Sequence, residues 1–227
     1  LTRQKAGPTL TTLAPKKPTP QMIGRLVAAG ARVSAGHTDA DYAAMRAAFE
    51  AGISGVTHLF NAMSPLQNRA PGVVGAALEN QDAWCGIIVD GHHVDPVTLR
   101  LALRCRPLDR FMLVTDAMPG VGADADHFML QGRRINVRNG ACHDEAGVLA
   151  GSDLDMIAAV RNAVDLLGLD LPQAVSMASS SPAAFLDLPD RGAIRQGCRA
   201  DLLVLDDGLT INGSWIDGIP ALPAGTS

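Results

Sequence analysis

The sequence predicts an α/β fold built around a parallel sheet, and two observations carry that prediction. Short apolar runs typical of buried strands alternate with segments of helical periodicity, which is the pattern of βα units. Four of these runs also end on residues that can bind a metal ion or move a proton: His37, His58, the pair His92 and His93, and Asp116. The carboxyl ends of strands in a parallel barrel open onto one face, so we expect these groups to converge on one site.

Apolar periodicity and the placement of Gly and Pro locate the elements before Asp116. The expected strands are TTLAP at residues 11–15 and the ranges 32–35, 55–58, 84–89 and 111–115. The expected helices are 21–29, 40–51, 73–79 and 96–105. Thr38 or Asp39 is expected to cap the second helix, and Pro96 suits the first turn of the fourth. A polar loop is expected over residues 61–72.

After Asp116 the alternation of strands and helices is interrupted. A segment rich in Gly and Asp predicts a β-hairpin insertion at about 124–150, lying over the strand-end face. Ser152, Asp153 or Asp155 is expected to cap a helix that runs to about Leu167, and a second helix follows at 171–179. A strand is expected at 201–205, with a frayed tail after Pro220. We therefore expect two units, a partial barrel at 1–190 and a small β segment at 191–227.

Composition excludes several classes of protein. The chain has 227 residues, of which 47% are hydrophobic and 19% charged, enough for a sizeable core. With a net charge of -4 and no basic block, nucleic acid is not expected as a partner. No apolar run approaches the roughly 20 residues that span a bilayer, and no signal peptide is visible. The four cysteines form no C-x-x-C pair, which favours free thiols and a cytoplasmic location.

The residue types at the strand ends indicate metal-assisted hydrolysis. Neutral imidazoles such as those of His37 and His58 are good zinc ligands, although a histidine can also simply end a strand. Asp116 could take a proton from metal-bound water and pass it to a leaving amine. The alternative for Asp116 is a carboxylate that caps a helix or a turn.

Two further side chains could contact a substrate. His93 offers a hydrogen bond to a hydroxyl or carbonyl group, Asp90 or Asp95 could orient its ring, and His92 could be an ordinary loop residue. Arg69 lies in the polar loop, where a guanidinium suits a phosphate group that it can hold with two hydrogen bonds. The alternative for Arg69 is a solvated surface arginine.

Taken together, these segments resemble the N-acetylglucosamine-6-phosphate deacetylase family of the amidohydrolase superfamily. The matching runs follow the family's order and cover the chain from Thr12 to about Gly218. They are SAGHTDA, GVTHLFNAM, NRAPG, CGIIVDGHHVD, LVTDAMP, RNG followed by GVLAGSDLDM, and RGAIRQGCRADLLVLD. As a set these motifs are specific to the family, whereas SAGH or VTDA alone would be weak.

The resemblance implies a TIM-like (β/α)8 barrel with a small β-sandwich built from both chain ends. The four strands that carry the site would be barrel strands five to eight. The resemblance also implies the role of each site residue: His37 and His58 bind a divalent metal, commonly zinc; Asp116 is the catalytic aspartate; Asn61 and Ala62 contact the sugar phosphate; Arg69 contacts the phosphate, often at a dimer boundary; His93 touches the sugar; and Leu149, Ala150 and Gly151 line the pocket with main chain.

The activity that the resemblance implies is hydrolysis of the acetamide of N-acetylglucosamine 6-phosphate to glucosamine 6-phosphate and acetate. Water activated by the metal would attack the carbonyl carbon, and Asp116 would shuttle the proton. The intact protein would be a cytoplasmic homodimer that acts on a small molecule.

One departure from the family pattern concerns the metal. The family uses a glutamate ligand in an HLEGP-type motif early in the barrel, and this sequence contains no such motif. A further substrate-contacting histidine upstream is also missing. We expect the first half of the barrel to be absent and metal binding to be weak, since three protein ligands are usual in a catalytic zinc site.

Two alternatives stay open at this point. The chain could be an amidohydrolase that acts on a different amide, because a fold does not determine the substrate. It could instead be an inactive, truncated remnant that binds a sugar phosphate.

Overall fold

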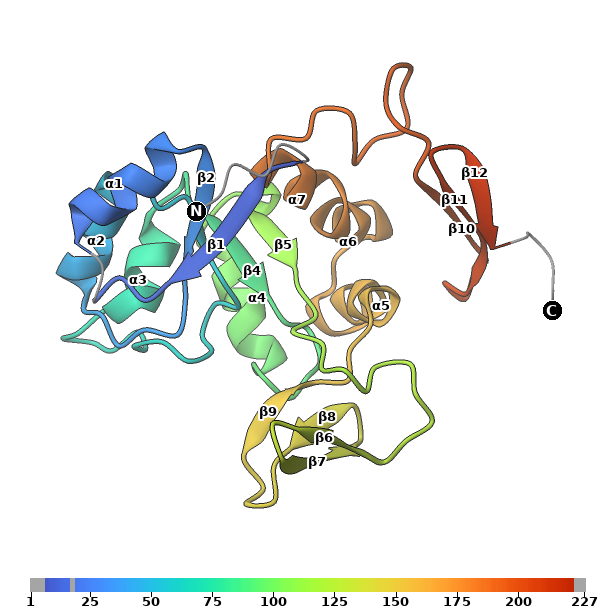
Figure 1. Cartoon of the computed structure of the whole chain (residues 1–227), viewed down its shortest axis with the longest axis horizontal. Coiled ribbons are helices and arrows are strands. Elements are labelled where there is room, and N and C mark those ends of the chain that lie inside the picture. The colour runs from blue at the N-terminus through green and yellow to red at the C-terminus, as the bar shows by residue number, and fades with distance from the viewer. Residues whose placement is uncertain (1–6, 17–18, 223–227) are drawn as a thin grey trace.

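A computed structural model describes residues 7–16 and 19–222 of the chain, and its centre is a five-stranded parallel sheet (Figure 1). The strands lie in chain order: β1 (Thr9–Leu13), β2 (Ala31–Ala35), β3 (Gly55–Val56), β4 (Trp84–Ile87) and β5 (Phe111–Leu113). A doubly wound sheet reverses its strand order at a switch point, whereas a barrel does not. This order is consistent with part of a barrel, and β1 adds a fifth strand to the four that carry the site.

Helices follow the strands as the alternation predicts. They are α1 (Pro20–Ala28), α2 (Tyr42–Glu50), α3 (Gly72–Glu79), α4 (Pro96–Arg104), α5 (Met156–Leu167), α6 (Leu171–Ala178) and α7 (Ser180–Phe185), with a short 3-10 turn, η1 (Leu108–Arg110), before β5. The sequence had indicated no helix at α7. Among the residues that the structure describes, no helix is both long and apolar enough to cross a bilayer.

The predicted cap of α2 is wrong, whereas the structure selects one of the three predicted candidates for the cap of α5. The cap of α2 is Asp41, whose side chain accepts a hydrogen bond from the Ala44 N–H, whereas Thr38 belongs to the turn before it. The cap of α5 is Asp155, because Ser152 is held in a strand and Asp153 in the link after it. In both cases several polar residues precede the helix, and long-range contacts decide which of them caps it.

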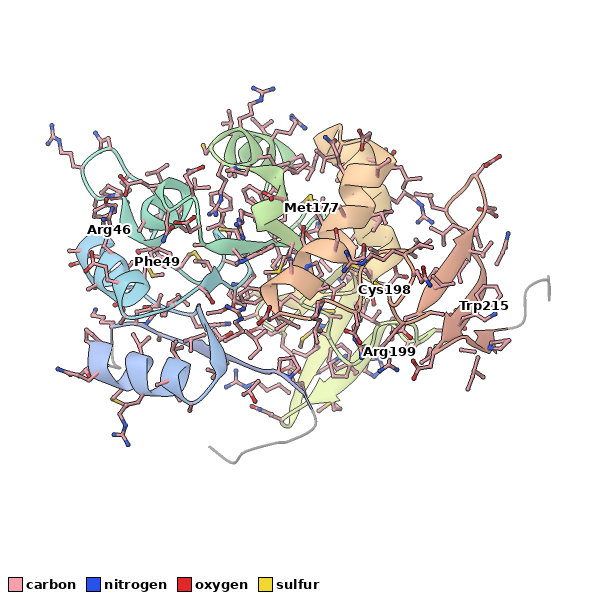
Figure 2. All side chains as sticks on the ribbon, turned by 90° about the horizontal axis from the view of Figure 1, so that it is seen from above. Arg46, Phe49, Met177, Cys198, Arg199 and Trp215 are labelled. Atoms are coloured by element: carbon pink, nitrogen blue, oxygen red, sulfur yellow. The ribbon has the colours of Figure 1, made fainter. Side chains whose placement is uncertain are left out.

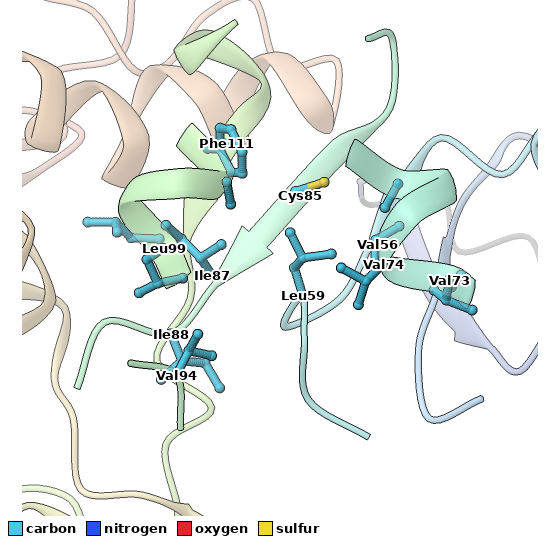
Figure 3. Close-up of a cluster of buried hydrophobic side chains, with 14 of the residues drawn as sticks. Val56, Leu59, Val73, Val74, Cys85, Ile87, Ile88, Val94, Leu99 and Phe111 are labelled. Atoms are coloured by element: carbon cyan, nitrogen blue, oxygen red, sulfur yellow. The ribbon is translucent and has the colours of Figure 1, made fainter. Parts of the chain in front are cut away.

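The register of the sheet aligns one apolar layer across all five strands. Leu13 pairs with Ala35, Ala35 with Val56, Val56 with Cys85, and Cys85 with Phe111. The last four are fully or almost fully buried, and Figure 3 shows several of them packed beside α3 and α4. Because alternate residues of a strand face opposite sides, this layer fixes which residues at the strand ends face the site.

The predicted hairpin insertion is in fact a four-stranded antiparallel sheet. It contains β6 (His127–Leu130), β7 (Arg133–Arg138), β8 (Ala141–His143) and β9 (Leu149–Ser152) in that order. A bridge between Ala117 and Ser152 connects it to the segment that leaves β5. The insertion is therefore anchored beside Asp116.

A three-stranded antiparallel sheet ends the described chain at the edge of the molecule (Figures 1 and 2). It consists of β10 (Leu202–Leu205), β11 (Ile211–Ile216) and β12 (Ile219–Leu222). The prediction of a frayed tail is wrong at its start, because Leu222 pairs with Ser214. The rest of that tail, residues 223–227, lies outside the described residues.

Candidate active site

His37 and His58 meet directly at the carboxyl ends of β2 and β3. Their Nε2 atoms lie 2.9 Å apart, and their rings are nearly perpendicular, at 80°. Two neutral imidazoles can share one proton in this arrangement, or both nitrogens can face a cation. Zn–N bonds of about 2.0–2.1 Å at a tetrahedral angle would place the two nitrogens roughly 3.3 Å apart. A shift of a few tenths of an ångström therefore makes the pair suitable for a metal.

The environment of His58 favours its neutral form. Only 4% of the residue is exposed, and this burial lowers the pKa of its imidazole below the usual value. A metal ligand must be unprotonated, so burial prepares this ring for coordination. Its Nδ1 atom is buried and has no hydrogen-bond partner among the described residues, so its ring lacks the usual support behind a metal-binding imidazole.

Left-handed backbone marks the strand ends that carry the site. The φ angles are 49° at His37, 34° at His58, 49° at Ala62 and 51° at Asp116. Residues other than Gly rarely adopt this conformation, and each such residue costs on the order of 1 kcal/mol or more. Strain of this kind is often found at functional sites, and other turns of the described chain, such as those at Asn139 and Asp187, adopt the same conformation.

Asp116 and His93 approach each other from the ends of β5 and β4. Asp116 Oδ2 lies 4.0 Å from His93 Nε2, and the aspartate side chain is half-exposed while the histidine ring is buried. The opposite ring nitrogen of His93 contacts Asp90, with Nδ1 and Oδ2 2.5 Å apart. The sequence left open whether Asp90 or Asp95 orients a histidine ring. The structure selects Asp90, since Asp95 caps α4 instead.

Ser152 holds the Asp116 turn in place. The Ser152 hydroxyl donates to the Thr115 carbonyl, and its backbone N–H donates to the Asp116 carbonyl at 3.1 Å. The residue is fully buried. The sequence analysis considered Ser152 only as a helix cap, and its position directly after the glycine of VLAGS was the signal for a different role.

Leu149, Ala150 and Gly151 form most of β9 and so lie in the strand next to this turn. A Cβ on Gly151 would lie 2.7 Å from both Cγ and Sδ of Met118 and 3.3 Å from the Asp116 carbonyl oxygen. The φ of 151° and the contact with Met118 both favour glycine at this position beside the Asp116 turn.

The loop after β3 carries the three residues predicted to contact the phosphate. The Asn61 side-chain amide donates to the carbonyls of His58 and Leu59, and the Ala62 carbonyl accepts from Thr38 N–H at 2.9 Å. These bonds tie the loop to both histidine-bearing strand ends. Arg69 is exposed, and no hydrogen bond or ion pair of its guanidinium occurs among the described residues.

His92 contacts the insertion. Its Nε2 atom lies 2.7 Å from the Asn139 carbonyl oxygen, in the turn between β7 and β8. A cavity of about 540 Å³ beside this contact is lined by His92, Arg138, His143 and Glu145, among others. Since His92 contacts the insertion, the structure supports its interpretation as an ordinary loop residue.

Among the described residues, the candidate metal site consists of the two imidazoles of His37 and His58. Within the described part of the chain, no three or more His, Cys, Asp or Glu side chains are grouped so that they could hold a metal ion. The donor set of His37 and His58 fits a borderline metal such as zinc in chemical type, but it is one ligand short of a usual catalytic site.

A parallel βα sheet with paired histidines and an aspartate at its strand ends is consistent with the class of hydrolase that the sequence predicts. The sequence model described as "Amidohydrolase family" matches residues 22–222, and the chain therefore belongs to that family. It is also homologous to N-acetylglucosamine- and N-acetylgalactosamine-6-phosphate deacetylases.

Three relatives illustrate this homology. N-acetylgalactosamine-6-phosphate deacetylase of Shewanella sp. (strain ANA-3) is 46% identical over 95% of this chain and 55% of the relative. N-acetylglucosamine-6-phosphate deacetylase of Haemophilus influenzae is 35% identical over 91% of this chain and 56% of its own length. The crystal structure of N-acetylglucosamine-6-phosphate deacetylase from Pasteurella multocida superimposes with a TM-score of 0.90 at 39% identity, covering 95% of this chain and 57% of that one. The chain thus spans about half the length of the relatives it matches.

Proposed function

We propose that the intact protein hydrolyses the acetamide of an N-acetylhexosamine 6-phosphate, with N-acetylglucosamine 6-phosphate as the substrate, to the free amino sugar phosphate and acetate. The observation that carries this proposal is the convergence of His37 and His58, whose Nε2 atoms are 2.9 Å apart. The relatives named as deacetylases of such sugar phosphates support the choice of substrate class.

His37 and His58 would hold a divalent metal, zinc in our proposal. When bound there, the metal would polarise the acetamide carbonyl and lower the pKa of a water molecule. The convergent Nε2 atoms and the burial of His58 are the features of this chain that fit such an ion.

Asp116 is the proton carrier in this proposal. Its half-exposed carboxylate can accept the proton of the attacking water, and it can deliver that proton to the amine that leaves when the C–N bond breaks. The hydroxyl oxygen remains with the acetyl carbon, and acetate is released. Ser152 fixes the turn from which this carboxylate projects.

The remaining residues bind the sugar phosphate. His93 contacts the sugar, Asn61 and Ala62 contact the sugar phosphate, and Arg69 binds the phosphate as a free guanidinium. Leu149, Ala150 and Gly151 line the pocket with main chain. The connection of the Asn61 loop to both histidine-bearing strands supports a pocket that extends from the metal to the phosphate.

The architecture around this site is also part of the proposal. Residues 1–190 form the C-terminal half of a (β/α)8 barrel, and residues 191–227 form part of a β-sandwich. The intact protein is a cytoplasmic homodimer. Size-exclusion chromatography with light scattering tests the dimer.

The test of the function is acetate release. The 227-residue chain and a form extended to the length of its relatives are each incubated with zinc and with the gluco or the galacto N-acetylhexosamine 6-phosphate. The relative at 46% identity carries the galactosamine name, so both epimers are needed. We expect turnover by the extended form and far less by the shorter one. Absence of acetate from both forms would refute the proposed reaction, and equal turnover would refute the need for a further ligand.

A further inference from the structure

A buried carboxylate lies directly behind His93, on the side away from the reacting groups. The Asp90 side chain is only 2% exposed, and it follows β4 in the turn that leads to His93. We propose that Asp90 is a positioning residue that keeps the proton of the neutral His93 ring on Nδ1, so that Nε2 faces the site as a hydrogen-bond acceptor. This inference rests on the proposed function, in which His93 contacts the sugar.

In each of its contacts the Asp90 side chain can act as an acceptor. Oδ2 accepts from His93 Nδ1 at 2.5 Å, and Oδ1 accepts from the backbone N–H groups of His92 and His93, both at 2.9 Å. Burial alone would raise the pKa of this carboxyl, but the hydrogen bonds from His93 and His92 outweigh burial and lower it to about 2. A permanent carboxylate can only accept, so the bridging proton belongs to His93 Nδ1.

The free nitrogen of the ring faces Asp116. Its distance of 4.0 Å from Asp116 Oδ2 exceeds the roughly 3.2 Å limit of a good hydrogen bond. No hydrogen bond of His93 Nε2 occurs among the described residues, although 94% of the side chain is removed from solvent. The lone pair on Nε2 is thus available to a sugar hydroxyl or to a proton in transit between substrate and Asp116.

The substitution Asp90→Asn tests the positioning role of Asp90 while keeping the hydrogen bonds that hold its turn. The amide oxygen of Asn replaces Oδ1 and still accepts the two backbone N–H groups. The NH2 group then occupies the position of Oδ2, where it donates to His93 Nδ1 and forces the ring proton onto Nε2. The turn is kept, and the tautomer is reversed.

Nitrogen NMR of the His93 ring in the 227-residue chain tests this assignment without any assay of activity. At about pH 8, where an ordinary imidazole is neutral, we expect the proton on Nδ1 in the unaltered protein and on Nε2 in Asp90→Asn. His93→Gln identifies the signals. A proton on Nε2 in the unaltered protein would overturn the inference even if the variant did not fold.

Turnover by the extended form tests the consequence for the reaction. We expect kcat for acetate release to fall about 100-fold in Asp90→Asn, as for loss of a proton-transferring group. Asp95→Asn is the matched control on the same loop, because Asp95 only caps α4, and its kcat should stay within about twofold. Unchanged kcat despite a reversed tautomer would refute the positioning role. If no form releases acetate, the proposed function fails, while the NMR result still decides the role of Asp90.

Discussion

The guanidinium of Arg106 donates to the Cys85 sulfur at a distance of 3.0 Å, and both residues are buried. No carboxylate neutralises Arg106 among the described residues. Its other donations go to the carbonyl oxygens of Ala77, Ala83 and Gln81. Burial raises the pKa of the Cys85 thiol to about 11 despite the nearby positive charge, so the pair is a cation beside a neutral thiol. Arg106 therefore joins the end of α3 to the start of β4.

Replacing Arg106 by leucine should destabilise the fold strongly. The substitution leaves the two buried carbonyls of Ala77 and Ala83 without this donor, each costing about 1–3 kcal/mol, so we expect a total loss of about 2–6 kcal/mol. Urea denaturation followed by circular dichroism measures this loss in the free energy of unfolding. Arg104→Leu, at an exposed position of α4, is the control. A loss for Arg106→Leu no larger than that of the control would contradict the prediction.

Zinc binding should depend on both histidines. We expect the 227-residue chain to bind zinc weakly, and His37→Ala or His58→Ala to weaken binding at least tenfold, because a single imidazole then remains. Isothermal titration calorimetry measures the affinity. His127→Ala is a suitable control, since His127 pairs with Asp126 on β6. An unchanged affinity in either histidine variant would show that zinc binds elsewhere.

Arg69 should discriminate phosphorylated from unphosphorylated sugar. A free guanidinium that holds phosphate contributes roughly 1.5–3 kcal/mol through charge-assisted hydrogen bonds, so Arg69→Ala should weaken binding of N-acetylglucosamine 6-phosphate at least tenfold. Binding of N-acetylglucosamine without the phosphate should not change. The exposed Arg25 of α1 provides a control as Arg25→Ala. If both sugars lose affinity equally, Arg69 acts on something other than the phosphate.

Acid should remove the stability that Asp90 supplies. Its pKa of about 2 in the folded state lies below the ordinary value of 3.8 for this side chain, so the folded state binds fewer protons than the unfolded state between these values. The contribution of Asp90 to the free energy of unfolding is on the order of 2 kcal/mol. It is fully present above about pH 4 and is lost as the pH falls toward 2. Thermal melts from pH 5 to 2.5 should show a steeper loss for the unaltered chain than for Asp90→Asn. Parallel curves would contradict this linkage.

Much of the fold could be predicted because its signals are local. The apolar runs before His37, His58 and Asp116 are each followed by a polar residue within a few positions, and this pattern alone identified the strand ends. The alternation with helices predicted that these strands are parallel, which the structure confirms. The cap of α2 was not among the predicted residues and that of α5 was one of three candidates, because several adjacent residues can cap a helix and distant partners make the selection.

The sequence by itself determined which residue types stand at the strand ends. Only the tertiary structure decided that His37 Nε2 meets His58 Nε2 across 21 positions of chain, and that Asp90 rather than Asp95 supports His93. Those relationships depend on the register of parallel strands and on left-handed backbone at His37, His58 and Asp116. The physical reason is that strand pairing depends on many contacts between residues far apart in the sequence, and no short segment contains that information.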